Sequence, residues 1–136
     1  MGSPAVPGRR RETYVGSPGF FLLNQACLAV NTAFDSVCFL VGSAVSYSTW
    51  RDVDVRIILP NDRFAELFPG LNGNPRVHPL WSLVCSSTSL WLGQATGLPV
   101  DFQVQSQAKA SFYQGQPRVP LGLFPTGGDG RGGDAG

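Results

Sequence analysis

The chain has 136 residues, 43% of them hydrophobic, and a formal net charge of +1. This length supports one domain with a buried core. The near-neutral charge excludes a general electrostatic attraction to nucleic acid or to a membrane surface, so an anionic ligand has to be bound by a local site. Cys27, Cys38 and Cys85 are odd in number and lie in apolar surroundings, which predicts buried free thiols, a reducing compartment and hence a cytoplasmic location.

The two ends of the chain differ in composition from its middle. Residues 1–17 are rich in Gly, Pro, Ser and Arg and predict a flexible N-terminal tail; residues 114–136 predict a Gly/Pro-rich C-terminal tail, which leaves a domain over residues 18–113. Arg9 to Arg11 could steer a nucleic acid or an acidic partner, although a solvated tail is the favoured interpretation. No membrane span is predicted, because residues 79–100 lack charges but carry many hydroxyl and amide groups.

The first half of the domain predicts a helix, a strand and a turn. Residues 18–34 predict a helix that packs on the back of a sheet. Its expected stripe consists of Phe21, Leu22, Gln25, Leu28, Ala29 and Thr32. Residues 37–41 predict a buried strand that ends at Gly42 and Ser43, where glycine permits close approach of a ligand and serine offers donors to phosphate oxygens. A short helical turn is expected over residues 43–48.

The alternation after residue 51 predicts a strand with one apolar and one polar face. Val53, Val55, Ile57 and Leu59 form the apolar face, and Asp52, Asp54 and Arg56 form the other. Two carboxylates at positions i and i+2 of a strand point to the same side, where they can hold a hard divalent cation. Arg56 shares their face, so it either clamps a phosphate or offsets the repulsion between the carboxylates.

The second half predicts a short helix after the turn at residues 60–62, a loop over residues 69–79 and a long core helix over residues 80–95. The expected inner side of the long helix consists of Leu80, Leu83, Val84, Leu90 and Trp91. Gly97 ends this helix, and residues 100–105 alternate as a strand with Asp101 on its polar face. Residues 107–113 predict a last turn of helix. His78 lies in the loop, and a loop histidine without function is favoured over a catalytic or ligand residue.

Three short segments carry a resemblance to a known family. They are Val-Gly-Ser at residues 41–43, Asp-Val-Asp-Val at residues 52–55 and Leu-Pro-Val-Asp-Phe-Gln-Val-Gln at residues 98–105. The chain resembles the nucleotidyltransferase superfamily with a DNA polymerase β-like fold, in particular its small single-domain members, the minimal nucleotidyltransferases. The resemblance covers roughly half of the chain. It implies an α/β (α+β) fold, a small mixed sheet with helices packed on one face.

The resemblance also implies a site and a reaction. Gly42 and Ser43 would contact a nucleoside triphosphate such as ATP, with Arg56 as a further candidate for binding it. Asp52, Asp54 and Asp101 would be catalytic and would bind Mg²⁺ or Mn²⁺. The implied reaction moves a nucleoside monophosphate to a hydroxyl of a protein, an RNA or a small molecule.

Two alternatives to an enzyme that acts alone stay open. The segment between Ser43 and Asp52 is shorter than is usual in the family, which is compatible with a catalytically degenerate member that binds a nucleotide or a protein. Small members also act beside a partner protein, so the acceptor could come from outside the domain. The simplest interpretation is that Asp52 and Asp54 bind nothing and only belong to the solvent-facing side of a half-exposed sheet.

Overall fold

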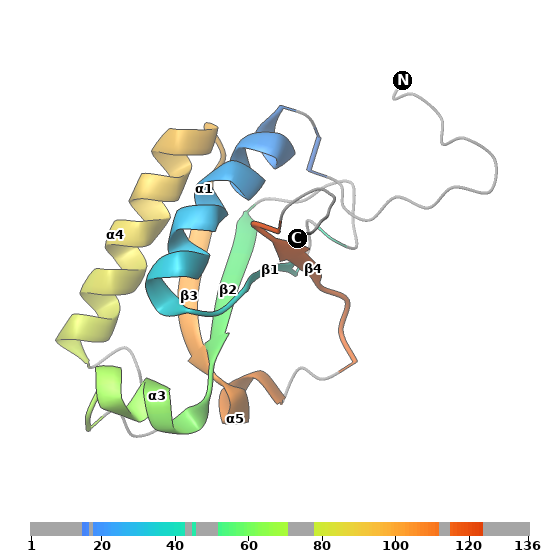
Figure 1. The fold of residues 1–136 in the computed structure, drawn as a ribbon. Helices are drawn as coiled ribbons and strands as arrows, with labels where there is room; N and C mark the ends of the chain where they lie inside the picture. Colours follow the sequence, from blue (N-terminus) through green and yellow to red (C-terminus); the bar gives the residue numbers. More distant parts are fainter. Residues whose placement is uncertain are drawn as a thin grey trace, which may run out of the picture.

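The computed structural model describes residues 15, 16, 18–42, 45, 52–70, 78–111 and 115–123. Their elements are α1 (Gly19–Phe34), β1 (Cys38–Val41), β2 (Val53–Leu59), α3 (Asn61–Leu67), α4 (Pro79–Thr96), β3 (Val100–Ser106), α5 (Gln107–Ala110) and β4 (Val119–Leu121). The predicted mixture of helices and strands is confirmed, and the bounds of α1, α3 and α4 lie within one or two residues of the predicted ones (Figure 1).

The four strands form one mixed sheet in the order β3-β2-β1-β4. β1 is antiparallel to both β2 and β4, and β2 is parallel to β3. A parallel pair cannot be joined by a tight turn, and α3 and α4 supply the long connection between β2 and β3. The helices of this connection therefore lie where they can cover the sheet.

One face of the sheet is buried and the other is half-exposed. Burial along β2 alternates strictly, so the predicted alternation is confirmed. The side chains of Val53, Val55, Ile57 and Leu59 are fully buried, and the neighbouring strands add Leu40, Phe102 and Leu121 to the same core. Leu23 of α1 and Leu92 of α4 are equally buried, so these two helices cover this face. The opposite face carries the polar residues of β2 and β3.

The inner sides predicted for the two long helices were wrong. α4 turns Trp81, Cys85, Leu92 and Thr96 to the core, whereas the expected inner residues Leu80, Leu83, Leu90 and Trp91 are 47%, 63%, 66% and 46% exposed. Val84 is partly buried against the core. α1 buries Leu23, Cys27 and Val30, and exposes Phe21 and Leu22. Both helices therefore present apolar side chains outward.

The outer edge of β3 explains the orientation of α4. Ser89 Oγ accepts the N–H of Phe102 at 2.8 Å, and Trp81 Nε1 donates to the carbonyl of Val104 at 2.9 Å. Both backbone groups belong to an edge strand and point away from β2, so without these side chains they would lack partners inside the protein. α4 therefore turns a serine and a tryptophan inward, and the leucines between them point outward.

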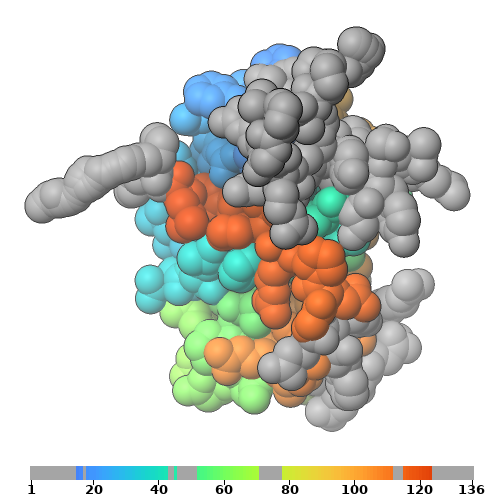
Figure 2. Space-filling model, turned by 90° about the vertical axis from the view of Figure 1, so that its right-hand side faces the viewer, coloured from blue at the N-terminus to red at the C-terminus, as the bar shows by residue number. Residues whose placement is uncertain are grey.

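The sheet extends into the segment predicted as a C-terminal tail. Val119–Leu121 form β4, which pairs with β1. Two asparagines of α1 hold it: Asn31 Nδ2 donates to the Leu121 carbonyl at 2.9 Å, and Asn24 Oδ1 accepts the N–H of Gly122 at 3.0 Å. Asn31 Oδ1 also accepts the N–H of Cys38 at 2.8 Å, so one side chain joins α1, β1 and β4. Figure 2 shows the red-orange residues of β4 at the surface beside α1.

The hydrogen bond between Ser89 and Phe102 can be tested by substitution. We expect Ser89→Ala to lower the free energy of unfolding by about 1–3 kcal/mol, because the buried N–H of Phe102 loses its acceptor. Ser86→Ala, an exposed serine of the same helix, should change it by less than about 0.5 kcal/mol. Urea unfolding of both variants measures the difference. Equal stability of the two would show that α4 is not anchored to β3 in this way.

Candidate functional site

Two of the three predicted carboxylates lie directly opposite each other. In the parallel pair of β2 and β3, Asp54 is the register partner of Asp101, and both lie near the N-terminal ends of their strands on the half-exposed face. On the other side of β2, Asp54 pairs with Val41, the last residue of β1. Gly42 follows Val41, so the turn after β1 and the two carboxylates meet at one end of the sheet.

Gly42 is packed against the carboxylate of Asp54. A Cβ added to Gly42 would overlap Asp54 Oδ2, and the φ angle of +79° is one that residues with side chains rarely adopt. The carbonyl of Gly42 accepts the N–H of Val45 at 3.1 Å, so the chain turns sharply after β1. Both observations require glycine at this position. Ser43, the second residue of the predicted turn, lies outside the described residues.

Arg56 connects the two carboxylates. Its Nη2 atom lies 3.4 Å from Asp101 Oδ2 and 3.9 Å from Asp54 Oδ1. Its Nη1 atom donates to the carbonyls of Asp101 at 2.7 Å and Val55 at 3.0 Å. The side chain of Arg56 is only 15% exposed, against 25% for Asp54 and 49% for Asp101. The guanidinium is therefore fixed by four oxygen contacts, beside the two acidic groups.

The electrostatics of the cluster are dominated by burial. Desolvation raises the pKa of Asp54 above its ordinary range, Arg56 opposes this shift, and the negative charges of Asp101 and Asp52 add to it. Asp52 is exposed and precedes β2, and its effect on Asp54 shows that it belongs to the same electrostatic cluster. The charge of Arg56 therefore does not fully offset the burial of Asp54 together with the two nearby negative charges.

The cluster has the right donors for a hard cation, but Arg56 lies against two of them. Carboxylate oxygens are the ligands that Mg²⁺ and Mn²⁺ prefer, and the raised pKa of Asp54 indicates negative charge that a cation would stabilise. Among the described residues, no three His, Cys, Asp or Glu side chains are arranged as a metal-binding group. The donor chemistry fits a divalent cation, whereas the arrangement shown has a guanidinium bound to the carboxylates of Asp54 and Asp101.

The other residues with reactive side chains have structural roles. His78 caps α4, with its Nδ1 atom accepting the N–H of Trp81 at 3.2 Å and its Nε2 atom 3.1 Å from the Pro69 carbonyl. A hydrogen bond with Cys27, together with burial, raises the pKa of the Cys38 thiol. Burial raises the pKa of Cys85 to about 11. The three thiols are buried and free, as predicted, and a protonated buried thiol is a poor nucleophile.

Sequence reasoning found the members of the cluster and gave a counter-charge to the carboxylates as one of two roles for Arg56, but it did not find the bonds of Arg56 to the main chain. Strand parity placed Arg56 on the face of Asp54, which is confirmed. The hydrogen bond from Arg56 to the main chain of Asp101 depends on the pairing of β2 with β3, and the alternation within each strand does not show which strands are neighbours. Arg9 to Arg11, for which a solvated tail was favoured over the steering of a partner, lie outside the described residues.

Comparison of the chain with models of protein families, with curated proteins and with solved structures finds no match. None of the described helices combines the length and the apolarity that a membrane-spanning helix needs.

The raised pKa of Asp54 predicts how this residue affects stability. A carboxyl group whose pKa is raised on folding favours the protonated form in the native state, so its contribution to stability falls as the pH rises from the ordinary value of 3.8 through the raised one. We expect Asp54→Asn to be more stable than the wild type at pH 7, and this advantage to shrink toward acidic pH. Thermal unfolding between pH 4 and 8, without divalent cations, measures the difference.

Glu66→Gln is the matched control, because Glu66 is an exposed carboxylate of α3 outside the cluster. Its stability should follow that of the wild type within about 0.5 kcal/mol. An Asp54→Asn variant that is less stable than the wild type at pH 7 would contradict the electrostatic description of the cluster.

Proposed function

We propose that this protein is a metal-dependent nucleotidyltransferase that moves a nucleoside monophosphate from a nucleoside triphosphate to a hydroxyl acceptor on a protein, an RNA or a small molecule. The observation that carries the proposal is the position of Asp54, directly opposite Asp101 on a parallel strand and packed against the Gly42 turn. The order along the chain also supports it: a glycine turn, then Asp-x-Asp, then a third aspartate on a neighbouring strand.

In the proposed site, Asp52, Asp54 and Asp101 would hold Mg²⁺ or Mn²⁺. When bound, the cation would neutralise triphosphate charge and lower the pKa of the acceptor hydroxyl. The residues themselves offer further chemistry. The Asp101 carboxylate is about half exposed, so it can accept a proton from an incoming hydroxyl. The turn at Gly42 brings the main chain after β1 beside the Asp54 carboxylate, and Arg56 has guanidinium donors suited to phosphate oxygens.

Pyrophosphate release tests this proposal. The wild type should release pyrophosphate from at least one nucleoside triphosphate in the presence of Mg²⁺ and a mixture of protein, RNA and small-molecule acceptors. Asp54→Asn and Asp101→Asn should each lower the rate by about 100- to 1,000-fold, because each removes a ligand that stabilises charge in the transition state. Glu66→Gln should keep the rate of the wild type. Full activity in Asp54→Asn would refute the assignment.

A second function is favoured by the contacts of Arg56. A guanidinium that bonds to both Asp54 and Asp101 can serve as a permanent counter-ion in the place of a metal. In that case the domain would bind a nucleotide or a partner protein without turnover, with Arg56 as a charged contact. The two functions differ in one property, which is whether the wild-type cluster accepts a divalent cation while Arg56 is present.

Thermal unfolding with and without Mg²⁺ separates the two functions. A ligand that binds the native state raises the free energy of unfolding by about 2.7 kcal/mol at a concentration 100 times its Kd, and the midpoint temperature rises with it. A wild-type shift with Mg²⁺ supports the metal site. No shift in the wild type, together with a shift in Arg56→Gln, supports Arg56 as the permanent counter-ion. Lys109→Gln removes an exposed cation of α5 and should behave like the wild type. No shift in any variant would refute cation binding by the cluster.

A further inference from the structure

The outward side of α1 and α4 forms an uncharged surface on which large apolar side chains are exposed. The 16 residues of α1 and the 18 residues of α4 include no Asp, Glu, Lys, Arg or His. On this side α4 exposes Leu83 by 63%, Leu90 by 66% and Trp91 by 46%. We call it the α1/α4 face. Large exposed apolar side chains that cluster on one face mark an interaction site more often than isolated ones do.

The exposed residues of α4 follow the spacing of a helix that packs against another helix. Steps of three and four residues alternate along the outward stripe, as in the a and d positions of a heptad. The stripe consists of Leu80, Leu83, Ser87, Leu90 and Gln94, all of them exposed. Its middle position is Ser87, whose small side chain lets a second backbone approach closely. The pattern is that of a helix-packing surface, but no described element covers it.

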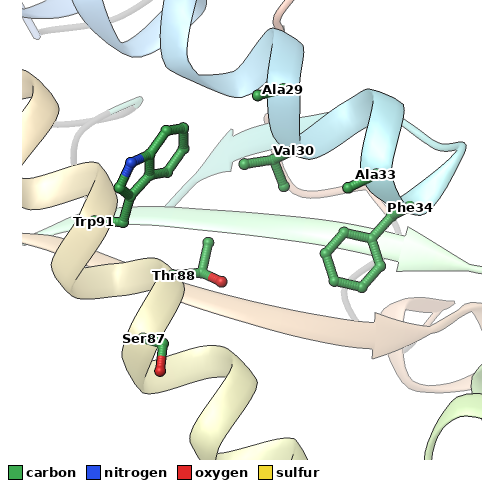
Figure 3. A pocket seen from close by; sticks show the side chains of 7 residues that line it. All are labelled: Ala29, Val30, Ala33, Phe34, Ser87, Thr88 and Trp91. Carbon is green, nitrogen blue, oxygen red and sulfur yellow. The ribbon is translucent and has the colours of Figure 1, made fainter.

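A hollow of about 340 Å³ lies beside this stripe, between α1 and α4. Figure 3 shows small side chains at its rims, Ala29 and Ala33 from α1 and Ser87 from α4, with Trp91 at one end. Its only side-chain polar groups are the two hydroxyls and the indole N–H of its lining. The α1/α4 face therefore combines protruding leucines with an adjacent recess that can receive an apolar side chain.

We infer that the α1/α4 face is the interface of a homodimer, formed with the same face of a second copy of this chain. A two-fold axis brings identical patches together, so protrusion and recess on one patch can fit each other. The absence of charge on this face also favours a second copy of the chain as the partner. A partner surface with charged groups would bury them here without counter-charges, which is costly, whereas a second copy contributes an equally uncharged face.

The size of the face sets the expected strength of the dimer. α4 is about 27 Å long at 1.5 Å per residue, and two adjacent helices are about 20 Å wide, so the footprint is at the small end for stable interfaces. We therefore expect a reversible monomer–dimer equilibrium that depends on protein concentration. This inference uses no residue of the carboxylate cluster, and it stands whether or not the protein transfers nucleotides.

Sedimentation velocity over a 100-fold range of concentration tests the inference. The wild type should shift from monomer to dimer as the concentration rises. The double variant Leu83→Glu and Leu90→Glu should stay monomeric at every concentration, because the dimer would bury four extra carboxylates. Leu123→Glu is the matched control, since Leu123 is 53% exposed and lies beyond β4, outside the α1/α4 face. It should dimerise like the wild type.

Two results would overturn the inference: a wild type that is monomeric at every concentration, and a dimer that persists in the double variant. Circular dichroism checks that the double variant is folded. If it is unfolded, Ser87→Cys decides, because a cysteine in the middle of the stripe should cross-link two copies under mild oxidation. Ser111→Cys, an exposed position outside the face, should not. Absence of cross-linking in Ser87→Cys would then overturn the inference.

Discussion

The register between β2 and β3 is the constraint on which both the core and the candidate site depend. Side chains alternate between the two faces of a sheet, so a slip of one residue would move Asp101 into the core and Phe102 out of it. Fully buried residues of both strands fix the register from one side, and the bond from Ser89 to Phe102 fixes the free edge of β3. The pairing of Asp54 with Asp101 on the open face follows from packing on the closed one.

The carboxylate cluster is an unfavourable arrangement that the fold keeps in place. Asp54 is partly desolvated and lies near two other acidic groups, and burial and these charges raise its pKa although Arg56 lies beside it. Carboxyl groups with a raised pKa are common where a ligand binds, because the ligand supplies the missing positive charge. The two functions considered for this protein differ mainly in which cation supplies that charge, a divalent ion or the guanidinium already present.

The strands were easier to predict from the sequence than the faces of the helices. β2 shows strict alternation, and burial confirms it residue by residue. α1 and α4 contain no charged residue, so counting apolar residues gave no unique inner side, and Leu83 and Leu90 were wrongly placed in the core. The orientation of α4 depends on the bonds of Trp81 and Ser89 to β3. β4 was missed because it is short, contains a proline and is held by Asn24 and Asn31 from a distant part of the sequence.

The position of β4 has a consequence for association between chains. β1 is an interior strand only because β4 pairs with it. Without β4, β1 would have one row of unpaired backbone groups, the kind of edge that invites contact with other chains. Asn31 bonds to both β1 and β4, so one amide side chain helps to keep this edge closed. Loss of β4 would therefore turn the middle of the sheet into a sticky border.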